Sequence, residues 1–248
     1  MREAHPTWNA TRVIQQAEAE FQAAGVGFFV RTLEAVRALR PKAKWGFYGF
    51  PQNPYNPCDS AGLCGAPACG YNGIMGPVYR AQNDAIQAVF NASTALFPSV
   101  YIPPSPAGWS PERFQAVNAE YVAAVTAEGV RLAENAPAGV VVRPYAWAFY
   151  HSGKTVLTAE DTASMASAGY QPPVADGVVL WGAASDFKTT GLMQQWLTSY
   201  GGKTMQASIK QQCSCSRTKC SGNGACDATG AGCECFAGYS GSACSKRE

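Results

Sequence analysis

Four aromatic residues lie near the carboxyl ends of four predicted strands: Tyr48, Tyr101, Tyr145 and Trp181. In α/β folds, ligands bind at the carboxyl ends of the strands. Flat aromatic faces pack against the C–H groups of a sugar ring, while tyrosine hydroxyls and the indole N–H supply hydrogen bonds. Together the four side chains favour a sugar-binding site. The alternative is that they fill a core, which is the commoner role of any single large aromatic residue.

Short apolar segments alternate with helical ones along the chain and would position these rings. Strands are predicted at 44–51, 99–104, 140–150 and 177–181, and a long loop at 51–77. Helices are predicted at 7–40, 78–96 and 111–135, from Thr158 and from about Thr189, and glycines at 25 and 27 could break the first of them. Continuous apolar strands alternating with helices predict an α/β fold with parallel strands and right-handed crossovers. The pattern fits either part of a (β/α)8 barrel, which needs eight strands, or an open four-stranded sheet.

The composition excludes several classes of protein. Of the 248 residues, 47% are apolar and only 15% are charged, against roughly 25% in a typical soluble domain. A disordered chain needs the opposite balance. The net charge of +2 gives no general electrostatic reason to bind nucleic acid or a membrane. No apolar run approaches the roughly 18–20 residues of a membrane span, and we expect none.

The ten cysteines are unevenly distributed. Seven lie between 213 and 244, and six of them follow the spacing C-x4-C-x5-C-x6-C-x-C-x8-C. We therefore predict a large domain at 1–212 and a small disulfide-rich module at 213–248. A zinc site is disfavoured because C-x2-C pairs and histidines are missing from that tail, and no metal or cofactor is expected. The pairing of Cys58, Cys64, Cys69 and Cys213 stays open: two of the loop cysteines could pair, and the third could join Cys213.

Such cysteine use indicates an oxidising compartment, and two sequons begin at Asn9 and Asn91. We expect a glycoprotein that is secreted, lysosomal or otherwise extracellular. The first residues contain no apolar stretch typical of a secretory signal, so a signal peptide is expected to be absent from this chain.

The segment RPKAKWGFYGFP at 40–51 closely resembles the hyaluronidases of animal type. The resemblance continues at 79–84, 97–103, 143–145 and 177–181. It implies a partial, TIM-like (β/α)8 barrel, namely the second half with about four βα units. It also implies a C-terminal EGF-like module with the pairs Cys215–Cys226, Cys220–Cys233 and Cys235–Cys244.

The resemblance implies hydrolysis of hyaluronan, and of chondroitin in some members, by a retaining and substrate-assisted mechanism. A glutamic acid protonates the glycosidic oxygen, the substrate's N-acetyl group attacks, and an aspartate two residues earlier orients that group. Aromatic residues shape the pocket around this sugar. By position they are Tyr48, Tyr101, Tyr145 and Trp181, and a glycosaminoglycan is the implied partner.

No Asp-x-Glu motif occurs in the sequence, so no catalytic residue is assigned. Glu160-Asp161 is typical of a helix N-terminus capped by Thr158, and Glu18 and Glu20 fit a solvent-exposed helix face. Of the two histidines, His5 is near the start of the chain and His151 could approach the site, although a lone histidine near a strand end is more often structural. We expect the acid to lie in a segment missing from this chain, which alone would not cleave hyaluronan.

Two other readings remain open. The chain could be a non-catalytic glycan-binding or adhesion protein, or a remnant without function. A partial barrel leaves open sheet edges, which a second copy or the missing N-terminal half would have to cover.

Overall fold

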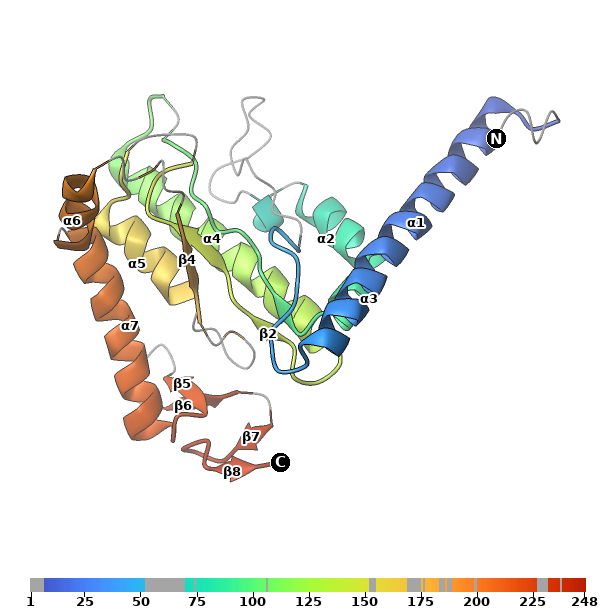
Figure 1. Cartoon of the computed structure of the whole chain (residues 1–248). Coiled ribbons are helices and arrows are strands. Elements are labelled where there is room, and N and C mark those ends of the chain that lie inside the picture. The colour runs from blue at the N-terminus through green and yellow to red at the C-terminus, as the bar shows by residue number, and fades with distance from the viewer. Residues whose placement is uncertain are drawn as a thin grey trace.

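The computed structural model describes residues 7–51, 70–73, 75–105, 107–151, 155–168, 175, 177–182, 186, 189–198, 200–226, 232–236 and 238–248. Helices cover a set of short parallel strands, and a small cysteine-rich tail follows the last helix (Figure 1). The helices are α1 (Ala10–Leu39), η1 (Gly70–Asn72), α2 (Gly76–Ala85), α3 (Gln87–Ala92), α4 (Pro111–Glu134), α5 (Ala159–Ala168), α6 (Thr190–Thr198) and α7 (Tyr200–Lys219). The strands are β1 (Ala95–Leu96), β2 (Val141–Val142), β3 (Tyr145–Trp147), β4 (Val179–Trp181), β5 (Gly224–Cys226), β6 (Cys233–Cys235), β7 (Tyr239–Ser240) and β8 (Lys246–Arg247). None of the described helices is long and apolar enough to span a membrane.

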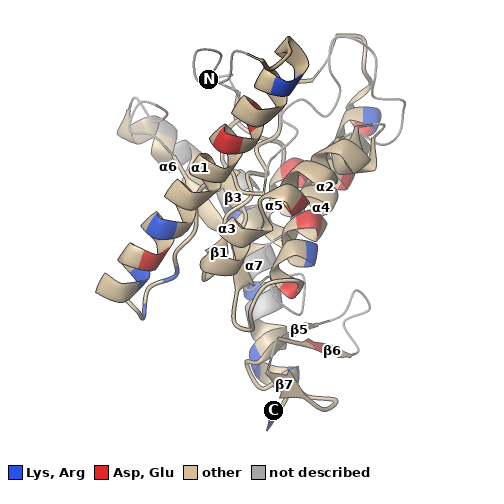
Figure 2. Cartoon of the chain, turned by 90° about the vertical axis from the view of Figure 1, so that its right-hand side faces the viewer, with Lys and Arg blue, Asp and Glu red and all other residues tan. Residues whose placement is uncertain are grey.

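Helix α1 is continuous for 30 residues, so the break considered at its glycines does not occur. It begins at Asn9, whose side-chain oxygen accepts a hydrogen bond of 2.9 Å from the backbone N–H of Arg12. Its C-terminal half packs through Leu33 against Val89 and Ala92 of α3. The N-terminal half projects away from the rest of the chain and carries both acidic and basic side chains (Figures 1 and 2).

Four segments at or next to the predicted strands pair in parallel and in chain order. Strand β1 pairs with β2, and β3 with β4. An isolated bridge from Ser99 to Tyr145 links the two pairs to one another. A second bridge, from Tyr48 to Phe97, adds the segment around Tyr48 beside β1. The predicted α/β class with parallel strands is confirmed. The described strands do not form a closed barrel.

The second predicted strand lies earlier in the chain than expected. The helical pattern of 78–96 predicts one helix, whereas the structure breaks it at Ile86 and ends it at Ala92. The N–H groups of Thr94 and Ala95 both donate to the carbonyl oxygen of Trp45, at 2.8 and 3.0 Å. This pairing with a distant segment decides the conformation of the helix-prone sequence.

Gly46 permits this pairing. A Cβ atom at position 46 would lie 1.9 Å from the carbonyl oxygen of Ala95. Only glycine allows the two backbones to approach so closely.

Helix α4 forms one wall of the main core. Its Tyr121, Val122 and Val125 are buried against Val100 and Ala146, which belong to the strand layer. The core therefore fixes the strands against a single long helix.

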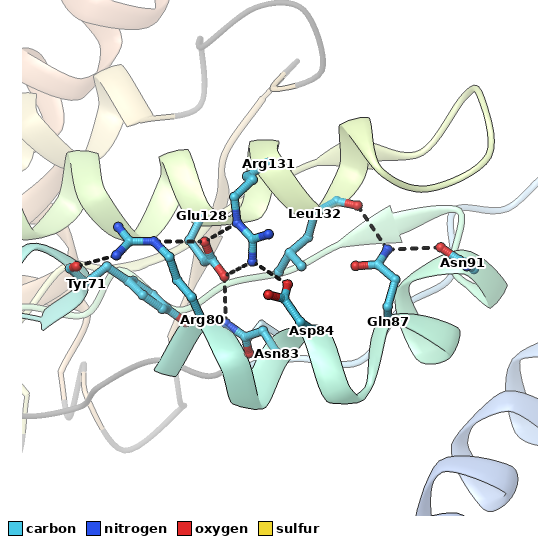
Figure 3. A network of polar contacts seen from close by, with 9 residues as sticks. All are labelled: Tyr71, Arg80, Asn83, Asp84, Gln87, Asn91, Glu128, Arg131 and Leu132. Carbon is cyan, nitrogen blue, oxygen red and sulfur yellow. Dashed lines mark hydrogen bonds and ion pairs between the residues drawn. The ribbon is translucent and has the colours of Figure 1, made fainter. Parts of the chain in front are cut away.

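A buried carboxylate links α4 to α2 (Figure 3). Glu128 is 2% exposed and accepts hydrogen bonds from Asn83 at 2.9 Å and from Arg131 at 2.8 Å. Arg80 lies 3.6 Å away on the other side, and Arg131 also binds Asp84 at 2.8 Å. Each buried oxygen of Glu128 thus has a charged or amide partner, which offsets its loss of hydration.

The cysteine-rich tail contains two antiparallel strand pairs, β5–β6 and β7–β8. It has the three disulfides that the resemblance implies, with Cα–Cα separations of 6.0, 5.6 and 5.2 Å. Helix α7 crosses the predicted domain boundary at 212/213 and ends at Lys219. Cys58, Cys64 and Cys69 lie outside the described residues, as does the side chain of Cys213.

We expect Glu128→Ala to lower the free energy of unfolding by about 3 kcal/mol, because it leaves the Asn83 amide and two arginines without their buried partner. Urea denaturation monitored by circular dichroism measures this loss. Asp84→Asn is the matched control, because Asp84 is 56% exposed and its ion pair with Arg131 should contribute at most about 1 kcal/mol. Equal effects of the two variants would contradict the assignment of Glu128 as the centre of the network.

Candidate functional site

Parallel pairing aligns the four predicted aromatic residues at one end of the strands. The N–H of Tyr145 donates to Pro98 at 2.8 Å, and the N–H of Val100 donates to Tyr145 at 2.9 Å. The register of β3 and β4 places Trp147 opposite Trp181. Residues from four separate segments therefore meet at neighbouring positions.

Their rings form one cluster centred on Tyr101. The ring centroid of Tyr101 lies 5.9 Å from that of Tyr48 and 6.1 Å from that of Trp181, with the second pair stacked. Tyr48 in turn lies 5.0 Å from Tyr145. All four residues predicted from the sequence are thus brought together. We call them, with Trp147 and His151 described below, the aromatic cluster.

Exposure divides the cluster into a base and a surface. Tyr101 is 6% exposed, whereas Tyr48 is 52% and Trp181 42% exposed. A buried ring that holds two exposed rings forms a rigid apolar platform open to solvent. Such a platform suits one face of a sugar ring.

The hydroxyl of Tyr101 remains a neutral hydrogen-bonding group at physiological pH. Burial raises the pKa of Tyr101, and the hydroxyls of Tyr48 and Tyr145 and the carboxylate of Asp186 raise it further. The hydroxyl of Tyr48 donates to Ser99 at 3.3 Å. The hydroxyl groups of the cluster can therefore offer polar contacts to a ligand.

Two residues of the site, Trp147 and Asp186, were not predicted from the sequence, and a third, His151, was predicted to have a structural role more often than a role in the site. Trp147 lies 5.6 Å from both Tyr101 and Trp181 and donates its indole N–H to Asp186 at 2.8 Å. Because it lies two residues after Tyr145 on one strand, the alternation of side chains could have identified it. The ring of His151 stacks on Tyr101 at 6.2 Å. Nothing in the local pattern around Asp186 identifies it.

The other acids considered from the sequence are engaged elsewhere. Asp161 is 1% exposed, accepts from Tyr150 at 2.5 Å and from Asn118 at 2.9 Å, and raises the pKa of Tyr150, after burial, to about 12. Its own N–H donates to Thr158 at 3.2 Å, which confirms Thr158 as the helix cap. Glu18 and Glu20 are exposed on α1, as predicted. Of the described carboxylates, Asp186 is the one that hydrogen-bonds to a ring of the cluster.

Both sequons lie on described helical surface. The Asn9 side chain caps α1, and Asn91 is exposed near the end of α3, where it accepts a hydrogen bond from Gln87 at 2.9 Å. Ser93 of the second sequon is buried in the folded chain. Glycosylation at Asn9 and Asn91 stays a prediction.

The fold and this cluster define an α/β protein with an aromatic site at the carboxyl ends of parallel strands. A family profile described as hyaluronidase matches residues 1–232, and the chain belongs to this family of glycoside hydrolases. It is 31% identical over 231 residues to Hyaluronidase-1 of Mus musculus and 32% identical over 228 residues to that of Homo sapiens. These alignments cover 90% of this chain and 46% and 48% of the relatives, so the chain spans about half their length.

Other relatives extend the comparison. A chondroitin hydrolase of Caenorhabditis elegans is 26% identical over 234 residues, which cover 91% of this chain and 46% of that protein. The crystal structure of bee venom hyaluronidase matches with a TM-score of 0.64 at 24% identity, over 82% of this chain and 61% of that one. The same enzyme in complex with a hyaluronic acid tetramer matches with a TM-score of 0.67 at 24% identity, over 84% and 60%. These two structures confirm the fold.

His151 should titrate below its ordinary value of about 6.5, because burial lowers its pKa. The folded state then favours the neutral ring. At pH values between the lowered pKa and about 6.5, the unfolded state binds more protons than the folded state does. The stability contributed by this group is therefore present above that window and is lost as the pH falls through it. A proton NMR titration of the imidazole signals measures the pKa, and His5→Gln assigns them. A His151 pKa at or above the ordinary value would contradict this environment.

Proposed function

We propose that this chain binds hyaluronan, and the related polymer chondroitin, through the aromatic cluster. The observation that carries the proposal is the convergence of Tyr48, Tyr101 and Trp181 from three separate segments, with two rings exposed on a buried third. The relatives support the choice of polymer. One was crystallised with a hyaluronic acid tetramer, and another is named a chondroitin hydrolase.

Each residue then has a distinct role toward the N-acetylhexosamine. The exposed faces of Trp181 and Tyr48 stack on the sugar, and Tyr101 holds both rings in position. The tyrosine hydroxyls of the cluster bind the acetamido oxygen, which keeps that oxygen directed toward the anomeric carbon. Restricting the acetamido group in this way favours the substrate-assisted, retaining route, because the internal nucleophile is already oriented.

The proton donor of that route is not assigned to this chain. The sequence has no Asp-x-Glu motif, and the Asp186 carboxylate is held by the Trp147 indole at 2.8 Å. In this proposal Asp186 is a positioning residue that fixes Trp147. Cleavage then requires an acid from a segment that these 248 residues do not include.

A second candidate function follows from the same two facts. A complete aromatic platform without an assigned acid suits a glycan-binding or adhesion protein that does not hydrolyse its ligand. The two candidates share the binding site and differ only in turnover.

The setting of the protein is part of the proposal. Three disulfides in the tail are favoured by an oxidising compartment, so we place the chain among secreted, extracellular or lysosomal glycoproteins, with the tail as an EGF-like module. In the described part of the chain, the parallel strands end at the segment around Tyr48 on one side and at β4 on the other. The N-terminal half of a barrel, or a second copy of this chain, would cover these edges.

Trp181→Ala should weaken the binding of a hyaluronan hexasaccharide by roughly fivefold to tenfold, because one aromatic stacking contact contributes about 1 kcal/mol. Tyr48→Phe should weaken it by roughly fivefold through the lost hydroxyl. Isothermal titration calorimetry measures both affinities.

Trp8→Ala and Tyr239→Phe are the matched controls, because they remove the same groups just before α1 and in the tail. If Trp181→Ala binds as tightly as the unchanged chain, the aromatic cluster is not the glycan site.

We expect the purified chain to release no reducing N-acetylhexosamine ends from hyaluronan, because no assigned residue donates the proton to the leaving oxygen. A colorimetric reducing-end assay over a wide pH range measures this. Release that disappears in Trp181→Ala would show that the chain contains its own acid, and would overturn this part of the proposal while leaving the binding site intact.

A further inference from the structure

A second polar site lies at the other end of the strands. An open pocket of about 230 Å³ is lined by the end of α1 with its following turn, the end of α3, and the loop before β2. Its cationic lining residues are Arg37, Lys42 and Lys44, and Asn91 and Gly139 also line it. We call it the basic pocket.

The strand directions separate this pocket from the aromatic cluster. Thr94 and Val140 line the pocket and directly precede β1 and β2, whose parallel pairing places their amino ends at the same edge. The aromatic residues lie toward the carboxyl ends. The basic pocket is therefore a distinct site at the opposite end of the strands.

Two of its cations are fixed in place by neutral groups. Arg37 Nη1 donates to the carbonyl oxygen of Ala92 at 2.8 Å, and Lys44 Nζ donates to that of Gly139 at 3.2 Å. Carbonyl oxygens orient these side chains without neutralising their charge. Figure 2 shows basic residues gathered at the end of α1 and along the segment that follows it.

The cations of the basic pocket form no ion pair with a described carboxylate: the ion pairs that Glu128 and Asp84 make are with Arg80 and Arg131. Lys42 is exposed and has neither a hydrogen-bond nor an ion-pair partner in the described part of the chain. Arg37 lies in the last turn of α1, where a positive charge stabilises the helix C-terminus. Lys42 and Lys44 lie beyond the helix, so this effect does not account for their presence.

We propose that the basic pocket binds an acidic group of the glycan, a carboxylate or a sulfate, as a second contact with the polymer; this rests on the proposed function. The volume is below the roughly 300–1,000 Å³ of pockets that enclose a whole organic ligand, and it suits one oxyanion. Arg37 supplies a planar fork for such an anion, and the lysines supply point charges. A polymer with an acidic group in each disaccharide offers many such ligands.

Inorganic sulfate tests the site without depending on the aromatic cluster. Sodium sulfate is titrated into the full ¹⁵N-labelled chain at constant ionic strength against sodium chloride, and amide shifts are followed by NMR. The reference chain and all variants carry Asn91→Gln, so that glycosylation at this lining residue does not differ between samples. We expect sulfate-specific shifts at 42–44 and 139–140, and up to about fivefold weaker binding in Lys42→Gln.

Arg31→Gln is the matched control, because it removes a cation from the same helix outside the pocket. Unchanged sulfate binding in this control supports the site. If Arg31→Gln weakens sulfate binding as much as Lys42→Gln does, the effect comes from general surface charge and the proposal is overturned. If Lys42→Gln does not weaken sulfate binding at all, the proposal is likewise overturned.

Oligosaccharides then distinguish the two anion sources. If the pocket takes a carboxylate, Lys42→Gln weakens the binding of hyaluronan and of sulfated chondroitin fragments alike; if it takes a sulfate, only the sulfated fragments lose affinity. If Lys42→Gln lowers the affinity for neither oligosaccharide but still weakens sulfate binding, the glycan is not the ligand of the pocket. Failure of the aromatic site is recognised separately, because Trp181→Ala would then leave glycan affinity unchanged while the effects of Lys42→Gln persist.

Discussion

Backbone hydrogen bonds on both sides of Tyr145 determine the candidate site. The N–H of Tyr145 donates to Pro98 and its carbonyl accepts from Val100, while the strand that it begins pairs with β4. A slip of one residue would turn every side chain of β3 to the opposite face of the sheet. Tyr145 and Trp147 would then leave the cluster together, and Trp181 would lose the ring opposite it. The register of the strands therefore decides which side chains can meet at the site, whatever their chemistry.

Two buried carboxylates hold the helical layer that keeps this register. Glu128 joins α4 to α2, and Asp161 joins α5 to Asn118 of α4 and to Tyr150. Each is satisfied by several donors, which a buried charge requires. Helix α4 is thus fixed to both of its neighbours, and its apolar face packs on Val100 and Ala146. In a chain with so few charges, two acids are used to position the layer that supports the strands.

The parts of the site that follow from local pattern could be predicted, and the parts that depend on distant contacts could not. Tyr48, Tyr101, Tyr145 and Trp181 were identified because each lies toward the carboxyl end of a predicted strand region, and Trp147 could have been found by alternation along β3. Asp186 reaches the cluster only through the fold of the chain after β4. The start of β1 was missed because helical periodicity continues through residues that Trp45 draws into pairing. The burial of Glu128 has no local signature, since an acid in a helix is normally solvated.

The two ends of the strand layer differ in charge in a way that suits an acidic polymer. At the carboxyl ends the cluster is uncharged apart from Asp186, whose carboxylate would repel an acidic sugar and favour the neutral N-acetylhexosamine. At the amino ends, the cations of the basic pocket would add a separate attraction for acidic groups elsewhere on the polymer. In this binding mode, preference for the neutral sugar at the platform needs no charged residue among the stacking rings. It follows from the single carboxylate of Asp186, which the Trp147 indole holds beside them.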